Sequence, residues 1–227
     1  LDLDPPPRFL VVGDAKTLKV PLTYNELPKS DLLTPEEQIR VEEKRRDIEE
    51  KNDPTRYYDG DHLLVSKVIY DQGKHIVYLV AERISYTELV VLKLRQTQEN
   101  DTAKWFQLGV FTPPITTDDC LVLMKRTGRP LWSQPGGFVE PLEGEINFQT
   151  GDLIRRTATQ ELTEELAGTG ENPQFSFTPP QPVAIGIRGA KGAQVGTIEV
   201  VAPTHVDKDA KALAEVVRTN KAPDSHE

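Results

Sequence analysis

Three glutamates crowd one side of a helix predicted at residues 152–166, and no other feature of the chain constrains its fold as strongly. Glu161, Glu164 and Glu165 stand at positions i, i+3 and i+4, so on an α-helix their carboxylates fall within an arc of about 100°. Like charges this close destabilise an isolated helix. A divalent cation would neutralise them, and oxygen ligands of this kind suit Mg²⁺ or Mn²⁺.

The stretch from Pro135 to Gly168 concentrates the negative charge of the chain. It holds seven acids and two bases, a sum of −5, whereas the net charge of all 227 residues is −9. An anionic substrate would be repelled here unless a bound metal inverted the local sign. The paired glycines Gly136 and Gly137 let the backbone take conformations closed to other residues and approach a ligand or the helix closely.

These blocks resemble the Nudix box of the Nudix hydrolases. The chain reads Pro-Gly-Gly-Phe-Val-Glu-Pro-Leu-Glu at residues 135–143 and Glu-Leu-Thr-Glu-Glu at residues 161–165. The family pattern is a glycine, five residues, a glutamate, seven residues, and then Arg-Glu-apolar-x-Glu-Glu-x-Gly-apolar. Gly137 and Glu143 match the first spacing, and the glutamates of the second block match the rest. The resemblance extends over residues 108–227, a little over half of the chain.

Three departures separate the chain from this pattern. Sixteen residues rather than seven lie between Glu143 and Gln160, which amounts to a nine-residue insertion. Gln160 stands where the family has an arginine that would hold a ligand glutamate through an ion pair. Ala167 replaces the usual glycine, although Gly168 follows it. These changes are similar to those of divergent members with an N-terminal extension, including hydrolases of UDP-sugars.

The resemblance implies a Mg²⁺-dependent diphosphatase. Such a hydrolase would cleave the diphosphate of a nucleoside diphosphate linked to another group, as in a UDP-sugar or an ADP-ribose-like compound. The implied cofactor is Mg²⁺ or Mn²⁺, and the implied partner is a small-molecule nucleotide substrate. Two alternatives stay open. One is a catalytically weak Nudix-fold module that binds nucleotide or regulates, and the other is an adaptor that uses a helix at residues 34–51.

The same resemblance implies roles for individual residues. Glu161, Glu164 and Glu165 would be metal ligands and catalytic carboxylates. Glu143 would be a further ligand or an assisting carboxylate. Arginine suits phosphate geometry, which makes the arginines just beyond a predicted strand candidates for holding the diphosphate. The substrate-binding candidates are Arg126, Arg129, Gly136 and Gly137.

The mixture of strands and helices after residue 104 predicts an α/β domain at residues 105–227, and the resemblance implies a Nudix-like α/β/α sandwich with a mixed sheet. The residues before it, 1–104, predict an α+β extension. The expected strands of the second part are 120–125, in the centre of the sheet and with Cys120 buried, together with 183–187 and 196–201, and a last helix is expected at 207–218.

Capping boxes and alternating patterns define the elements of the extension. Thr34 and Glu37 predict the start of a charged surface helix that reaches residue 51. Two extended runs, at residues 62–70 and 75–81, predict a β-hairpin. Ser85 and Glu88 form a second capping box, which favours a helix over residues 85–96 despite their β-branched content.

Composition excludes several classes of protein. The net charge of −9 argues against a surface for nucleic acid or anionic membrane. No apolar run approaches the roughly 18 residues of a membrane helix. The single cysteine, Cys120, excludes an internal disulfide and a cysteine-ligated zinc site. Residues 1–7 lack a targeting pattern, so a cytoplasmic location is the default expectation. The sequence indicates no oligomeric state.

Overall fold

The structure is a computed structural model that describes residues 8–12, 18–24, 32–51, 59–71, 73–95, 103–125, 132–141, 151–167, 174–189 and 194–220. In chain order the elements are β1 (Arg8–Val12), β2 (Leu22–Tyr24), α2 (Pro35–Lys51), β3 (Asp61–Asp71), β4 (Ile76–Ser85), α3 (Tyr86–Lys93), β5 (Trp105–Phe111), β6 (Pro114–Ile115), β7 (Met124–Lys125), β8 (Trp132–Ser133), β9 (Gly136–Phe138), α4 (Gly151–Leu162), the π-helix η1 (Thr163–Ala167), β10 (Ala184–Arg188), β11 (Val195–Val201), β12 (Thr204–His205) and α5 (Ala210–Asn220).

An eight-stranded mixed sheet organises the chain, with strand order β1-β10-β11-β5-β3-β4-β2 and β9 attached to β5. The pairs β5–β11 and β2–β4 are parallel, and the other pairs are antiparallel. The prediction of a mixed α/β fold is therefore confirmed. Along one of its edges, β5 pairs first with β3 and then with β9. Phe106 and Gln107 pair with β3, whereas residues 109–111 pair with β9.

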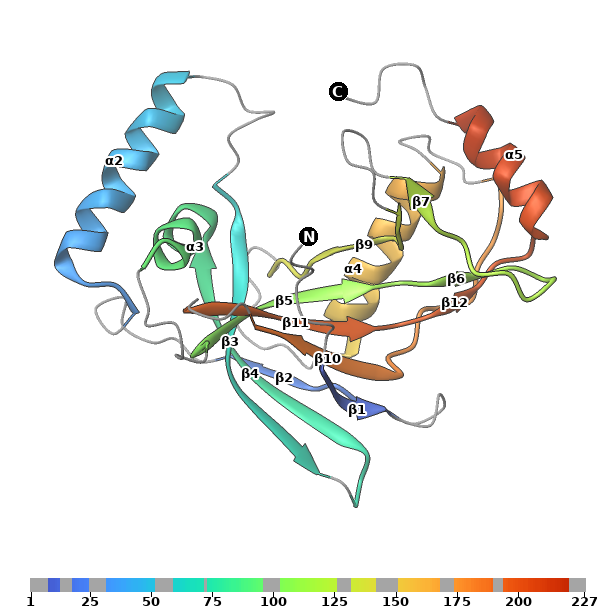
Figure 1. Cartoon of the computed structure of the whole chain (residues 1–227), viewed down its shortest axis with the longest axis horizontal. Helices are drawn as coiled ribbons and strands as arrows, with labels where there is room; N and C mark the ends of the chain where they lie inside the picture. The colour runs from blue at the N-terminus through green and yellow to red at the C-terminus, as the bar shows by residue number, and fades with distance from the viewer. Residues whose placement is uncertain are drawn as a thin grey trace, which may run out of the picture.

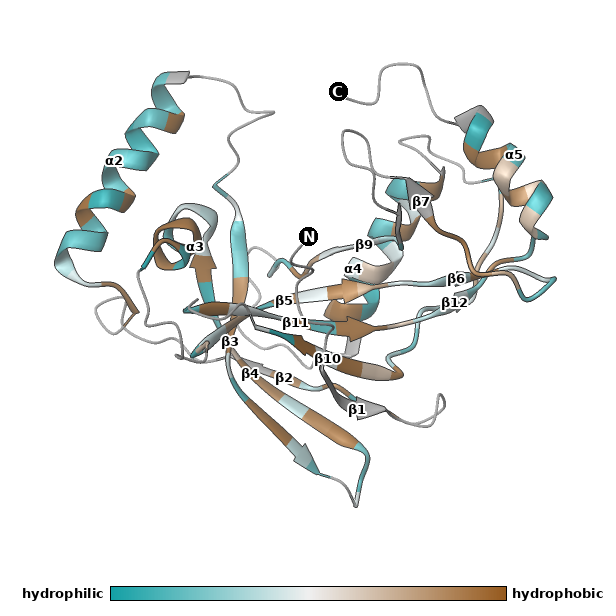
Figure 2. Ribbon diagram, in the orientation of Figure 1, coloured by the Kyte–Doolittle hydropathy of each residue, from teal (hydrophilic) through white to brown (hydrophobic). Residues whose placement is uncertain are grey.

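Helices cover both faces of the sheet around β3 (Figure 1). Successive strand residues point to opposite faces. Leu63 and Val65 accordingly enter one buried cluster with Ile154 of α4, whereas Leu64 enters a second cluster with Leu89 of α3. Hydrophobic residues gather on the central strands and on α3, while α2 is mostly hydrophilic (Figure 2). These two cores hold the sheet between α4 on one side and α3 with α2 on the other.

Both predicted capping boxes are present. The Ser85 hydroxyl accepts from the Glu88 N–H at 3.2 Å, and the Glu88 carboxylate accepts from the Ser85 N–H at 2.9 Å. At α2, Thr34 and Glu37 exchange the equivalent bonds at 3.3 and 2.8 Å. The hairpin is confirmed as β3–β4, and the strands at 183–187 and 196–201 as β10 and β11. Most of α2 is exposed as predicted, although Val41 is buried against α3.

The prediction of a central strand at residues 120–125 is wrong. Only Met124 and Lys125 form a strand there, and it pairs with β8 outside the main sheet. A turn closes just before it, because the Thr116 hydroxyl accepts from the Cys120 N–H at 3.0 Å and the Thr116 N–H donates to the Cys120 carbonyl at 3.0 Å. Cys120 is exposed, not buried. The central strand is β5, which the sequence reading did not identify.

Strands from both sides of the boundary predicted at residue 104 lie in one sheet. Leu64 and Val65 of β3 pair with Gln107 and Phe106 of β5, and the main core joins residues from both parts. The extension is thus hydrogen-bonded to the rest of the chain. Among the described helices, none is both long and apolar enough to cross a bilayer.

Candidate functional site

The paired glycines lie on β9, where neither position has room for a side chain. A Cβ on Gly136 would overlap the carbonyl oxygen of Val110 on β5. A Cβ on Gly137 would overlap the carboxylate of Glu161, which comes from the last turn of α4. The two glycines therefore allow two close approaches, one by the neighbouring strand and one by an acidic side chain. This is the close approach to the helix that the sequence predicts.

A second carboxylate reaches the same strand. The Gly136 N–H donates to Oε2 of Glu165 at 3.3 Å. Glu165 belongs to η1, which continues α4 as a π-helix at residues 163–167. Single π-turns inside α-helices are rare and occur frequently at functional sites. Glu161 and Glu165 thus place two carboxylates against two adjacent glycines.

The three glutamates do not all lie on a regular α-helix. Glu161 belongs to α4, whereas Glu164 and Glu165 belong to the π-turn, which holds more residues per turn than an α-helix. Glu164 is exposed and accepts a hydrogen bond from the Gln160 amide at 2.9 Å. Gln160 therefore contacts one of the implied ligands from the position where the Nudix pattern has arginine. Glu164 lines the same cavity as Glu161.

A cavity of about 310 Å³ opens beside these groups. It lies where β3 and β9 both leave β5, so the extension and the second half of the chain each supply part of its wall. Its charged lining is mostly acidic, with three glutamates against one arginine, and His62, Thr157 and Gln160 complete the polar lining. The residues that matter for the site are His62, Phe138, Glu140, Arg156, Glu161 and Glu164.

The electrostatics of the cavity disfavour further negative charge. Burial raises the pKa of Glu140, and the negative charges of Asp61 and Glu164 raise it further. Burial lowers the pKa of His62, which also lines the cavity, and the nearby ammonium of Lys93 adds to that effect. The acidic side of this cavity therefore favours a cation over a further anion.

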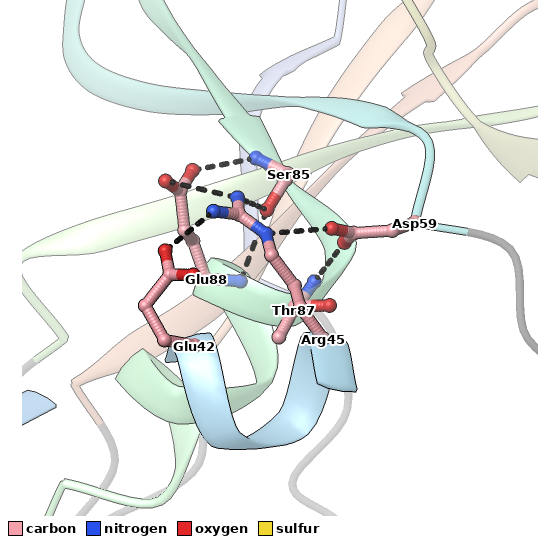
Figure 3. Close-up of polar contacts among 6 residues, drawn as sticks. All are labelled: Glu42, Arg45, Asp59, Ser85, Thr87 and Glu88. Atoms are coloured by element: carbon pink, nitrogen blue, oxygen red, sulfur yellow. Dashed lines mark hydrogen bonds and ion pairs between the residues drawn. The ribbon is translucent and has the colours of Figure 1, made fainter. Parts of the chain in front are cut away.

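Arg45 is the centre of a cluster of polar contacts in the extension (Figure 3). Its guanidinium donates to Asp59 at 3.1 Å and to the Ser85 hydroxyl at 3.2 Å, and it lies 3.5 Å from Glu88. Asp59 also accepts from the Thr87 N–H at 2.7 Å. Burial raises the pKa of Asp59, but these hydrogen bonds outweigh it and hold the pKa below its usual value. The cluster ties α2 and α3 to the residues that lead into β3.

The donor chemistry near β9 suits the implied metal, since Glu161 and Glu165 offer carboxylate oxygens and Mg²⁺ prefers oxygen ligands. Within the described ranges, no three His, Cys, Asp or Glu side chains are grouped as an ion site. Glu143, the further ligand that the resemblance implies, lies outside those ranges. The assignment of metal ligands stays a prediction.

The structure brings together four of the sequence candidates and leaves others undescribed. Gly136, Gly137, Glu161 and Glu165 meet at β9, and Glu164 lies at the cavity wall. The residues outside the described ranges are Glu143, Arg126 and Arg129.

Sequence reasoning did not single out His62. Its side chain is only 7% exposed, and its Nδ1 has no hydrogen-bond partner among the described residues. No local pattern marks it, because its neighbours Phe138 and Tyr86 lie far away in the sequence or in another element. In the sequence, Glu140 was only one of the seven acids between Pro135 and Gly168.

Comparison with known proteins adds no relative. The chain matches no protein-family model. No curated protein resembles it closely enough to count as a relative either. The motif in the sequence and the geometry at β9 are therefore the two features that bear on function.

Proposed function

We propose that this chain is a Mg²⁺-dependent hydrolase of the Nudix type, with a Nudix-like α/β/α arrangement around the mixed sheet. Its substrate would be a nucleoside diphosphate linked to another group, such as a UDP-sugar or an ADP-ribose-like compound. One observation carries the proposal. Two carboxylates, Glu161 and Glu165, lie against the paired glycines Gly136 and Gly137 on β9, and Glu161 also lines the cavity.

The spacing of the motif and the contacts support each other. In the Nudix pattern the glycine and the glutamates are far apart in sequence, and the pattern alone gives no reason why position 137 must be glycine. The contact with Glu161 supplies that reason, because any side chain there would displace the carboxylate. An acidic helix with a solvated, purely structural role would not need a glycine on a neighbouring strand.

The proposed roles follow from these positions. Glu161 and Glu165 would hold the metal, and Glu164, at the cavity wall, would assist them. When bound, Mg²⁺ would stabilise the charge that develops on the phosphate oxygens and favour attack by water. Arg156 lies on the same wall, where a guanidinium suits a phosphate oxygen. Because Gly136 and Gly137 have no side chains, the carboxylates of Glu161 and Glu165 can lie against the backbone of β9.

A binding module that does not hydrolyse nucleotide is the second candidate, and one observation favours it. Glu164 is engaged by the neutral Gln160 amide on an exposed surface, and the described residues contain no group of three acidic ligands. A chain of this kind would bind nucleotide and leave it intact.

A substrate screen distinguishes the two candidates. The protein is incubated with UDP-glucose, ADP-ribose and related diphosphates, with and without Mg²⁺, and the products are identified by mass spectrometry. We expect Mg²⁺-dependent cleavage of at least one diphosphate, with two phosphorylated products. Binding in calorimetry without any product would support the binding module, and neither binding nor cleavage would contradict both.

A further inference from the structure

Two aromatic side chains remain exposed on either side of a buried histidine at the edge of the cavity. Phe138 is 43% exposed and Tyr86 is 46% exposed, whereas His62 between them is 7% exposed. The His62 ring meets Phe138 edge-on, with centroids 6.2 Å apart, and Tyr86 at a tilt, with centroids 5.7 Å apart. His62 and Phe138 both line the cavity that Glu161 and Glu164 line.

The backbone explains why the Phe138 ring stays open. Phe138 pairs with Gly109 across the strands β9 and β5, so its partner position has no side chain to cover the ring. The Lys93 ammonium lies 5.8 Å from the ring centroid and donates to the Gln107 side chain at 2.7 Å. An aromatic ring next to an ammonium and a buried imidazole is thus held in place by its neighbours while part of it faces the cavity.

A ligand with two chemically different parts fits this cavity. The carboxylates at one wall suit a metal-bound diphosphate, and the aromatic edge suits a flat apolar ring with polar groups on its rim. The volume of about 310 Å³ lies at the lower end of the range for small-molecule sites, roughly 300–1,000 Å³. Nδ1 of His62 has no hydrogen-bond partner among the described residues, which leaves one hydrogen-bonding atom unused at this edge of the cavity.

We propose that Phe138, supported by His62, is the stacking surface for a planar aromatic ring of the ligand, of the nucleobase class. The proposal deepens the proposed function and rests on it for the position of the diphosphate. The proposal also assigns a role in ligand binding to the extension. β3 supplies His62 and α3 supplies Tyr86 and Lys93, so residues before the predicted boundary complete a subsite for residues after it.

The test measures binding, not hydrolysis. Calorimetry without Mg²⁺ compares UMP and AMP with ribose 5-phosphate, which has the same phosphate and sugar but no ring. Phe138→Leu keeps an apolar side chain and removes the aromatic face. Tyr70→Leu is the matched control, because Tyr70 is 41% exposed, lies on the β3–β4 hairpin and is not among the residues that line the cavity.

Base–aromatic stacking is worth enough that Phe138→Leu should weaken UMP or AMP binding by roughly 10-fold or more. Ribose 5-phosphate binding should stay unchanged, and Tyr70→Leu should bind all three ligands as the wild type does. Equal loss for ligands with and without a ring, or no loss at all, overturns the proposal.

A second measurement needs no variant. In proton NMR of the wild-type protein, the ring protons of UMP or AMP should shift upfield on binding, because the ligand ring lies over an aromatic face. No such shift at saturating protein, or no binding of either nucleotide, overturns the proposal. Ring binding without diphosphate hydrolysis would contradict only the proposed function, and hydrolysis without a ring preference would contradict only the subsite.

Discussion

The carboxylate of Glu161 lies against the backbone of Gly137, in the space that any side chain at position 137 would take. The neighbouring glycine has a different constraint, since a Cβ on Gly136 would meet the backbone carbonyl of Val110. A flexible side chain can move away from a methyl group, whereas a strand backbone cannot. The two glycines of one dipeptide should therefore respond differently to the same substitution.

Gly136→Ala should destabilise the fold. Its new methyl group would push β9 away from β5, and forcing extra carbon into a packed site typically costs about 1–3 kcal/mol. Urea unfolding of Gly136→Ala and wild type measures the difference. Gly189→Ala is the control, because a Cβ there would meet nothing within 4 Å. A Gly136→Ala protein as stable as Gly189→Ala would contradict the described contact between the strands.

Gly137→Ala should keep the fold and displace Glu161. The clash is with the far end of a flexible side chain, so the free energy of unfolding should change less than in Gly136→Ala. Under the proposed function, the Mg²⁺ concentration for half-maximal hydrolysis should rise roughly 10-fold, by analogy with the loss of groups that orient metal ligands. An unchanged Mg²⁺ dependence in Gly137→Ala would remove Glu161 from the metal site.

Arg45→Met should destabilise the protein by about 1–3 kcal/mol, because it leaves the buried Glu88 and the half-buried Asp59 without their cation. This range allows for the side chain of Arg45 being 30% exposed, since water screens part of the interaction. Arg40→Met, at an exposed position of the same helix, is the control. Urea unfolding at pH 7 measures both.

The same pair of variants has a pH signature. The folded-state pKa of Asp59 lies below its usual value of 3.8, so its contribution to stability is complete above that value and is lost as the pH falls through the folded pKa. The stability gap between wild type and Arg45→Met should therefore narrow as the pH falls below about 4. A gap that stays constant from pH 7 to pH 3 would show that the ion pairs do not cause it.

Glu140→Gln should stabilise the protein at neutral pH. Burial, with Asp61 and Glu164 nearby, raises the pKa of Glu140 above its usual value of 4.5, so the folded state loses stability as the pH rises through the window between the two values. A glutamine side chain at this position does not ionise, so the variant does not lose folding stability in that pH window. Glu36→Gln, on the exposed start of α2, is the matched control.

Thermal unfolding from pH 4 to pH 8 tests this prediction. The advantage of Glu140→Gln over wild type should be small at pH 4 and grow as the pH rises. If Glu140→Gln and Glu36→Gln show the same pH profile, the cavity does not disfavour the charge on Glu140.

Local chemistry made much of the fold predictable. A capping box needs only residues three apart, so Ser85 with Glu88 and Thr34 with Glu37 could be found in the sequence. The alternation over β3 and β4 is equally local. The paired glycines predicted a close approach of the backbone to a ligand or to the helix, and Gly137 lies against Glu161 of that helix.

Other features depend on contacts that no local pattern records. The run that begins at Cys120 is apolar enough for a strand, yet a turn held by Thr116 uses its first backbone groups. Residues 163–167 form a π-turn in place of an α-helical turn, and helix periodicity does not signal such a turn. His62 meets Phe138 only because β3 and β9 leave β5 at the same place.

The most direct test of the account is the Mg²⁺-dependent cleavage of the best diphosphate substrate by wild type and Glu165→Gln. The amide keeps the shape of the side chain and removes its charge. Glu215→Gln, on the exposed face of α5, is the control. We predict that Glu165→Gln lowers turnover at least roughly 100-fold with an unchanged melting temperature, as expected for the loss of a transition-state contact, and that the control matches wild type. Equal turnover of all three proteins, or no Mg²⁺-dependent cleavage by wild type, would contradict the claim that these carboxylates form an active site.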